Sequence, residues 1–349
     1  MDNQRNLILA VLLTGLVLFG WDAAVRYFYP ATDTPAQRAA AVAEGTAQAE
    51  TASPAGASAP GMAAQRRDLA SALAPGGRIS VKAPGLEGSI NLTGALIDDL
   101  TITRHRETAD EDSGPVRIFA PAGTPMQHFA QLGWVGENVD LPTASSVWTA
   151  SGESLTPETP VTLTWSNGSG LGFAIAFTID EDYLITATQT VANTAGGPVV
   201  VRPFGLINRT GQTADPDTWN VHSGPIGSFA GSVSFGPDYD DLRKAGTVEM
   251  DGRAGFAGFT DIYWMSALAP VDARAQGSFR ALEGSIYRAD ILYDPVTVPA
   301  GKQVVRTTKL FAGAKENDVL ERYEAAGIEN FGLSIDWGWF YFLTKPIFA

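Results

Sequence analysis

The chain has 349 residues, a formal net charge of −14 at pH 7 and no cysteine. This length is enough for one large domain or two ordinary ones with extensions. The negative charge repels phosphate backbones, so nucleic acid is not an expected partner. The lack of thiols excludes disulfides and cysteine-based metal or catalytic sites. The 37 glycines and 21 prolines predict many turns, which favours a β-rich body.

An uncharged apolar run near the N-terminus predicts a membrane anchor. Residues 7–21 read LILAVLLTGLVLFGW, and the apolar and aromatic residues that follow extend the run to the ~20 residues that a membrane-spanning helix needs. Trp21 and Tyr27 would lie in the aromatic belt at the membrane interface, and Arg5 favours a cytoplasmic N-terminus. The alternative is a cleaved signal peptide. Because no small-residue cleavage site follows cleanly, we expect an uncleaved anchor over 1–29.

Residues 30–77 are dominated by Ala, with Pro, Gly, Ser, Thr and Gln, and the chain has no aromatic residue between Pro30 and Ile118. Such a stretch buries too little apolar surface to offset the entropy lost on ordering. It predicts a flexible periplasmic linker, in which the alanines favour transient helix over residues 65–73.

The pattern changes to strands from about Arg78 onward. Residues 161–165 (VTLTW) and 173–179 (FAIAFTI) alternate between apolar and other residues, which is typical of half-buried strands. Turn residues separate such segments at short intervals, without βαβ spacing or a fixed-period repeat. The sequence therefore predicts a mostly β protein, with one large antiparallel β-sandwich over 78–313.

A single helix follows the predicted strands. Residues 315–326 read KENDVLERYEAA, and Gly327 suits the position after a helix C-terminus. We expect residues 314–335 to form an amphipathic helix and a connector. Two placements remain open: the apolar stripe lies on the membrane surface, or it packs on the sandwich. The stripe consists of Val319, Leu320 and Tyr323.

The end of the chain is dense in aromatic residues. Trp337, Trp339 and Tyr341 belong to the run DWGWFYFLTKPIFA over residues 336–349. Such a cluster is typical of a membrane interface. We interpret it as the truncated start of a second membrane helix, and so expect the natural protein to be longer.

Little in the sequence predicts catalysis. The three histidines show no metal-ligand spacing; His105 is expected to be solvated and His222 to bond nearby backbone. Asp98 and Asp99, like the aspartates within 238–241, have polar surroundings typical of turns or caps. Residues 168–172 (GSGLG) lie between strand patterns and predict a hairpin turn, not a phosphate loop. We expect no catalytic residue, metal ligand or cofactor. The third histidine is His128.

Several short segments, in order and spacing across nearly the whole chain, resemble the YidC insertase family of Gram-negative bacteria. These segments are residues 1–7 (MDNQRNL), 92–100 (LTGALIDDL), 223–227 (SGPIG), 258–264 (GFTDIYW) with 268–270 (LAP), 335–339 (IDWGW) and 342–346 (FLTKP).

This resemblance implies a β-supersandwich similar to galactose mutarotase-like folds. It implies insertion, folding and assembly of inner-membrane proteins, alone or beside the Sec translocon. The expected partners are newly made membrane proteins, the translocon with its accessory subunits, and the phospholipid bilayer. The expected location is the inner membrane, with several spans in the full-length protein and the large domain in the periplasm.

The family inserts its substrates through a polar groove within the membrane, built around a buried arginine on the second membrane helix. The resemblance places that arginine beyond position 349, so we expect this chain to lack the insertase core. It also implies that residues 315–335 join the domain to the membrane core, and that a Sec accessory subunit contacts residues 221–258.

Two other functions fit the same predicted fold. One is a membrane-anchored carbohydrate-active enzyme, which would need a histidine and a carboxylate converging in a cavity. The other is a binding protein that holds partner chains at the membrane. The fold alone does not license catalysis.

Overall fold

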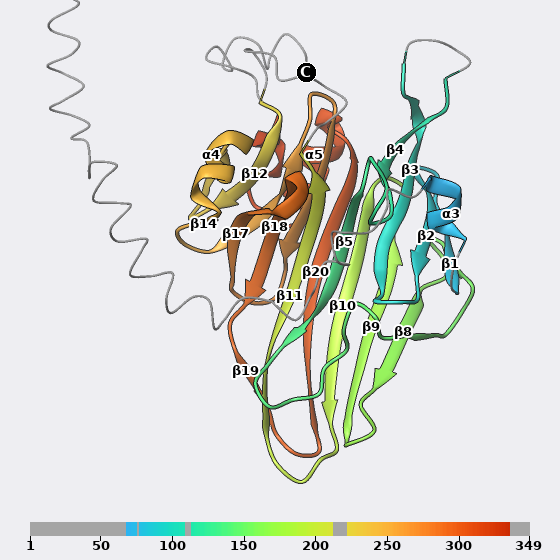
Figure 1. The fold of residues 1–349 in the computed structure, drawn as a ribbon, viewed down its shortest axis with the longest axis vertical. Helices are drawn as coiled ribbons and strands as arrows, with labels where there is room; N and C mark the ends of the chain where they lie inside the picture. Colours follow the sequence, from blue (N-terminus) through green and yellow to red (C-terminus); the bar gives the residue numbers. More distant parts are fainter. Residues whose placement is uncertain (1–67, 75–76, 109–112, 212–221, 336–349) are drawn as a thin grey trace, which may run out of the picture. The chain divides into compact units, whose positions relative to one another are not determined.

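The computed structural model describes residues 68–74, 77–108, 113–211 and 222–335 (Figure 1). These residues belong to one compact unit spanning residues 54–349. They form two β-sheets that stack face to face, joined by tight turns and a few short helices. The predicted antiparallel β-sandwich is confirmed.

The first sheet has eleven strands, and all of its pairs are antiparallel except β1 with β7. Its order is β14 (Thr247–Glu249), β17 (Ala275–Leu282), β18 (Ile286–Tyr293), β11 (Val199–Thr210), β5 (His128–Val135), β3 (Leu96–Arg106), β2 (Leu86–Asn91), β1 (Arg78–Lys82) and β7 (Ser154–Leu155), with β4 (Pro115–Phe119) beside β3 and β19 (Val296–Val298) beside β11.

The second sheet has nine strands. Their order is β13 (Ser232–Phe235), β12 (Gly224–Phe229), β15 (Ala254–Thr260), β16 (Trp264–Pro270), β20 (Lys302–Ala314), β10 (Leu184–Asn193), β9 (Leu171–Ile179), β8 (Val161–Ser166) and β6 (Thr149–Ala150). Every second residue of β9, from Leu171 to Ile179, is buried, as its alternation predicts. The predicted hairpin turn at residues 168–172 joins β8 to β9, with Gly168 and Gly170 at positive φ.

Short helices connect the strands. They are α3 (Leu69–Leu73), α4 (Tyr239–Ala245), η1 (Glu283–Ser285), α5 (Asn317–Ala325) and η2 (Phe331–Ser334). Asp68 and Asp238 cap α3 and α4, because their carboxylates accept backbone N–H groups of the first turn. Helix α3 lies in the stretch predicted as a linker. Within the described ranges, no helix is both long and apolar enough to cross a membrane.

The main hydrophobic core draws its side chains from strands of both sheets, which pack against each other. Its largest fully buried side chains include Phe177, Phe259 and Phe311. A second, smaller cluster holds Phe204 and Leu206. Because Gly205 between them faces Leu268 of the other sheet, Phe204 and Leu206 lie on the opposite face of the first sheet. The sandwich therefore has apolar side chains on both faces of this sheet.

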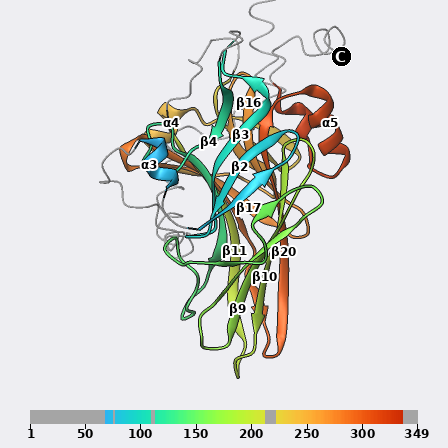
Figure 2. The ribbon, with the colours of Figure 1, turned by 90° about the vertical axis from the view of Figure 1, so that its right-hand side faces the viewer.

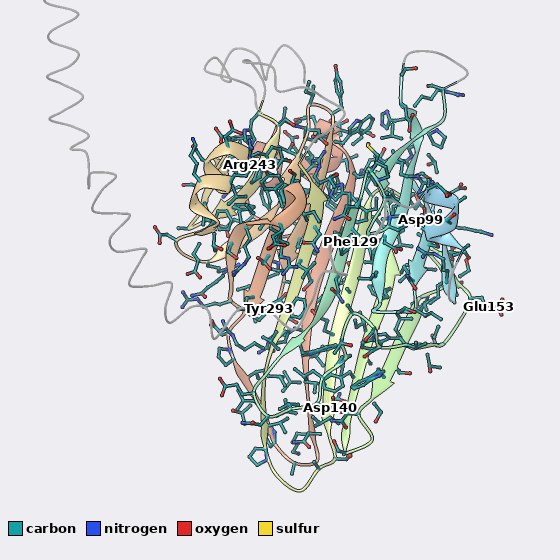
Figure 3. The ribbon with its side chains drawn as sticks, in the orientation of Figure 1. Asp99, Phe129, Asp140, Glu153, Arg243 and Tyr293 are labelled. Carbon is teal, nitrogen blue, oxygen red and sulfur yellow. The ribbon has the colours of Figure 1, made fainter. Side chains whose placement is uncertain are left out.

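Asp98 and Asp99 correct one expectation from the sequence. Both lie inside strand β3, only 2% and 9% exposed, instead of in a solvated turn. Arg78 pairs with Asp98, and Arg117 pairs with Asp99, which Figure 3 labels. Burial raises the pKa of the Asp98 carboxyl, although the Arg78 charge opposes this shift. Arg117 lies on β4, next to β3, and Arg78 lies on β1, beyond β2, so local sequence offered no sign of either pairing.

Candidate functional site

A cavity of about 710 Å³ opens between the two sheets at one end of the sandwich. Strands β4, β5 and β11 of the first sheet form one wall, and β15 and β16 of the second sheet form the other. Val116, Phe259 and Met265 make much of the lining apolar, while Met126 and Tyr263 stand exposed at 57% and 63%. Polar and charged side chains, among them Arg117 and Gln127, share the lining with these apolar groups. A cavity that combines apolar walls with fixed polar groups is a usual form of binding site.

The polar centre of this cavity is a buried ion pair. Arg209 Nη2 donates to Asp261 Oδ2 over 2.6 Å, and Ser223 Oγ donates to the other carboxylate oxygen over 3.1 Å. The side chains of Arg209 and Asp261 are 8% and 12% exposed. Removing two charges from water is costly, so each depends on the other and on its hydrogen bonds. The pair fixes the turn after β15 against the end of β11.

His128 lies beside this pair at the start of β5. Its Nε2 is 2.8 Å from Ser266 Oγ, and its ring meets Phe119 and Phe259 edge-on. Burial, helped by the positive charge of Arg209, lowers the pKa of His128 well below the ordinary value of 6.5. The imidazole is therefore neutral at physiological pH, and Ser266 can donate to it.

A serine beside a neutral histidine resembles a nucleophile with its base, but the rest of the chemistry does not follow. An efficient base of this kind has a carboxylate that stabilises the imidazolium. Here the neighbouring charge is Arg209, which opposes protonation of His128. Within the described ranges, no group of His, Asp and Glu has the arrangement of a metal site. The pair of His128 and Ser266 therefore does not have the arrangement of a serine nucleophile with an activated base.

Helix α5 is mounted on the sandwich next to this end. Val319, Leu320 and Tyr323 are 4%, 0% and 5% exposed and belong to the main core. The rings of Phe311 and Phe331 pack edge-on against each other, and Tyr323 contacts both. Of the two placements left open by the sequence, these side chains adopt the one on the sandwich. They are therefore not available for contact with lipid.

Polar contacts fix the same helix on both sides. Tyr323 Oη donates to Asp180 Oδ2 over 2.6 Å and accepts the Tyr183 N–H over 3.1 Å. Arg322 Nη2 donates to Asp182 Oδ2 over 2.7 Å, and Arg104 pairs with the other oxygen of Asp182 at 2.5 Å. Burial, reinforced by the bond to Asp180, raises the pKa of Tyr323. The turn between β9 and β10 thus provides the polar contacts that hold α5 in place.

Glu316, the N-cap residue of α5, holds the third contact. Tyr183 Oη donates to Glu316 Oε1 over 2.6 Å, and His105 Nε2 lies 2.9 Å from the same oxygen. Burial opposes the charge of Glu316, but the bonds from His105 and Tyr183 outweigh it and lower the pKa of this carboxyl. His105 was expected to be solvated; its side chain is 37% exposed, and it also joins β3 to the N-cap of α5. This histidine–carboxylate pair does not line the cavity.

The other predicted site residues divide into two groups. His222 bonds nearby backbone as predicted, since its Nε2 is 2.9 Å from the Pro225 carbonyl oxygen. The expected interface residues fall outside the described ranges. Those are Trp21, Tyr27, Trp337, Trp339 and Tyr341.

Sequence reasoning missed the ion pair in the cavity. Arg209 and Asp261 are 52 positions apart, so no local pattern joins them. Asp261 does belong to the segment GFTDIYW, which carried part of the resemblance. Its place in that segment was the one available signal.

Comparison with known proteins identifies the family. The pattern described as the YidC periplasmic domain matches residues 78–349. A protein of Zymomonas mobilis is 37% identical over 99% of this chain and 59% of its own length. One of Ruegeria is 45% identical over 76% of this chain and 46% of its own length. One of Bradyrhizobium diazoefficiens is 38% identical over 100% of this chain and 61% of its own length. All three are named membrane protein insertase YidC.

Solved structures with a similar arrangement include a galactose mutarotase-like protein from Lactobacillus casei, with a TM-score of 0.44 and 15% identity over 68% of this chain and 100% of that one. A GalM/aldose epimerase homologue from C. elegans has a TM-score of 0.41 and 9% identity over 69% of this chain and 99% of that one. The chain spans about three fifths of the relatives that it matches from end to end. It belongs to the YidC family, and residues 78–349 carry the pattern of that family's periplasmic domain.

Proposed function

We propose that the chain acts in the insertion, folding and assembly of inner-membrane proteins. Its β-sandwich lies in the periplasm, and residues 1–29 anchor it in the inner membrane. The match of the family pattern to residues 78–349 supports this proposal, together with relatives at 34–45% identity that are named membrane protein insertases. The proposed partners are newly made membrane proteins, the Sec translocon and the bilayer.

Within this function we assign the binding and positioning of substrate and partner chains to the sandwich. The transfer of a substrate segment into the membrane is assigned to the membrane part of the longer relatives. A polar substrate segment crosses lipid only if an intramembrane surface satisfies its charges and backbone groups. Several membrane spans are needed to enclose such a surface, and a β-domain in water cannot supply it. The 349 residues alone are therefore not sufficient for insertion.

Complementation tests this proposal. In cells depleted of their own insertase, a gene of full family length with this periplasmic domain should restore growth. A gene for residues 1–349 should not, although immunoblotting should show it at comparable abundance. Rescue by the 349-residue product would refute the assignment of transfer to the rest of the protein.

A Sec accessory subunit is the proposed partner of residues 221–258. The described part of this segment includes β13, an edge strand of the second sheet, where Phe235 is 39% exposed. An uncharged edge strand can pair with another chain. A photo-cross-linker at position 235 should capture the subunit in membranes. If cross-linkers at all four positions of β13 capture no subunit, this strand is excluded as the contact.

The carbohydrate-enzyme alternative is not favoured. An enzyme of this kind would need a histidine bonded to a carboxylate in a cavity. In this cavity His128 contacts Ser266 at 2.8 Å, and the Asp261 carboxylate pairs with Arg209 at 2.6 Å. The relatives are named as insertases.

A further inference from the structure

The turn between β15 and β16 has an unusual composition. Residues 261–264 read DIYW; Tyr263 is 63% exposed, while Ile262 and Trp264 are partly exposed. Hairpin turns usually carry Gly, Asn, Asp, Ser or Pro, which adopt turn geometry and bond water. Apolar side chains exposed together at such a turn form a patch of the kind that marks contact surfaces.

Hydrogen bonds and packing hold the residues of the turn in place. The Asp261 N–H donates to the Trp264 carbonyl over 2.8 Å and closes the turn. The Asp261 side chain is fixed by Arg209, and the Trp264 ring packs edge-on against His105 at 5.5 Å between centroids. An apolar tip on a rigid support loses little conformational entropy when it enters a partner.

The tip lies at the end of the domain where the chain turns toward its predicted second membrane segment. The Lys315 N–H, just before α5, donates to the Tyr263 carbonyl over 2.8 Å. Helix α5 leads to η2, where Leu333 is 44% exposed, and the sequence then continues into IDWGWFYF. Figure 2 shows β16 and α5 at the same end of the sandwich. Val200 is the second residue of β11, whose last residues, Arg209 and Thr210, line the cavity beside the tip, so it lies almost a strand length away from this end.

We propose that the tip formed by Ile262 and Tyr263, supported by Trp264 at the start of β16, inserts into the headgroup region of the phospholipid bilayer and sets the tilt of the domain over the membrane. Tyrosine and tryptophan prefer this region, because their rings enter the acyl boundary while O–H and N–H groups stay hydrated. The tip and the predicted aromatic segment after Ile335 would then hold the domain at two points. This inference depends on the proposed membrane location and not on insertase activity.

The chain has no cysteine, so single labels can be placed cleanly. Tyr263→Cys carries a nitroxide at the tip, and Val200→Cys is the matched control, an exposed apolar residue (50%) almost a strand length away. The full chain is reconstituted in nanodiscs of phosphatidylethanolamine and phosphatidylglycerol. We expect the ratio of oxygen to nickel-chelate accessibility to be several-fold higher at position 263 than at position 200, because oxygen concentrates in lipid.

Equal ratios at the two positions, in nanodiscs that hold the chain, would overturn the tip contact and leave the membrane location standing. Failure of the chain to co-purify with nanodiscs would overturn both. A second label at Ile262→Cys tests the tip directly. Adding Tyr263→Asp should return that label to the aqueous ratio while the melting temperature stays unchanged, since Tyr263 is 63% exposed. An unchanged lipid signal would contradict the proposal.

Discussion

At the scale of single residues, the cavity is defined by groups that are buried in one charge state. Arg209 and Asp261 are buried charged and compensate each other at 2.6 Å. His128 is buried neutral, because burial and the charge of Arg209 both oppose its protonation. A histidine buried in this way makes stability depend on pH, since in the unfolded chain it titrates at its ordinary value.

His128 gives a prediction with a definite sign. The pKa of His128 in the folded state lies well below 6.5. Below about pH 6.5 this histidine is therefore protonated in the unfolded state but not in the native state. The free energy of unfolding should therefore fall as pH decreases from that value, by at most about 1.4 kcal/mol for each pH unit from this group. Urea unfolding across this range should show a shallower slope for His128→Gln, and an identical slope in both proteins would refute the assignment.

At the scale of elements, α5 shows how a short helix becomes part of the β-sandwich. It is only nine residues long, too short to be stable alone in water. Its three apolar side chains enter the core, and Tyr323 carries polar contacts to the turn between β9 and β10. The helix is thus part of the domain, and the domain together with α5 can transmit its orientation to the segment that follows.

Tyr323→Phe tests this mounting. The ring remains, but the Tyr183 N–H loses its acceptor and Asp180 Oδ2 loses the donor from Tyr323. Leaving buried polar groups unpaired should lower the free energy of unfolding by about 1–3 kcal/mol, and amide exchange over Asn317–Ala325 should accelerate. Arg322→Ala is the control, because its side chain is 59% exposed and a pair so exposed to solvent contributes little. Equal effects from both variants would contradict a specific role for Tyr323.

At the scale of the whole molecule, the sequence divides the chain by composition. The alanine-rich residues 30–67 lack the apolar side chains that a packed structure needs, whereas the described strands share one large core. The strands should therefore resist a protease that cuts the predicted linker.

Limited trypsin treatment of the purified chain checks this division. The first cuts should fall at Arg38 and Arg66, inside the predicted linker, because a protease needs an extended, accessible backbone. Arg209 and Arg288, which are 7% and 6% exposed within strands, should be cut last. Mass spectrometry identifies the sites, and early cleavage at either strand arginine would contradict this prediction.

The sequence by itself determined the fold class, the position of α5 and the family. These follow from local signals: the alternation in β9, the helical run that ends before Gly327, and short motifs in a fixed order. Alternation requires only that one face of each strand is buried, so it can be read without knowing the partner strand.

Only the tertiary structure decided which residues meet. Arg209 with Asp261, His128 with Ser266 and Tyr323 with Asp180 join positions far apart in the chain. Their hydrogen bonds depend on how two sheets stack and on which turn receives a helix, and no local pattern encodes either. In the same way, Asp98, expected in solvent, is buried beside Arg78 from another strand of its own sheet, and the apolar stripe of α5 packs on the sandwich. A buried charge needs an opposite charge, and an apolar stripe needs an apolar surface. The sequence shows that such a partner is required, but not which residues provide it.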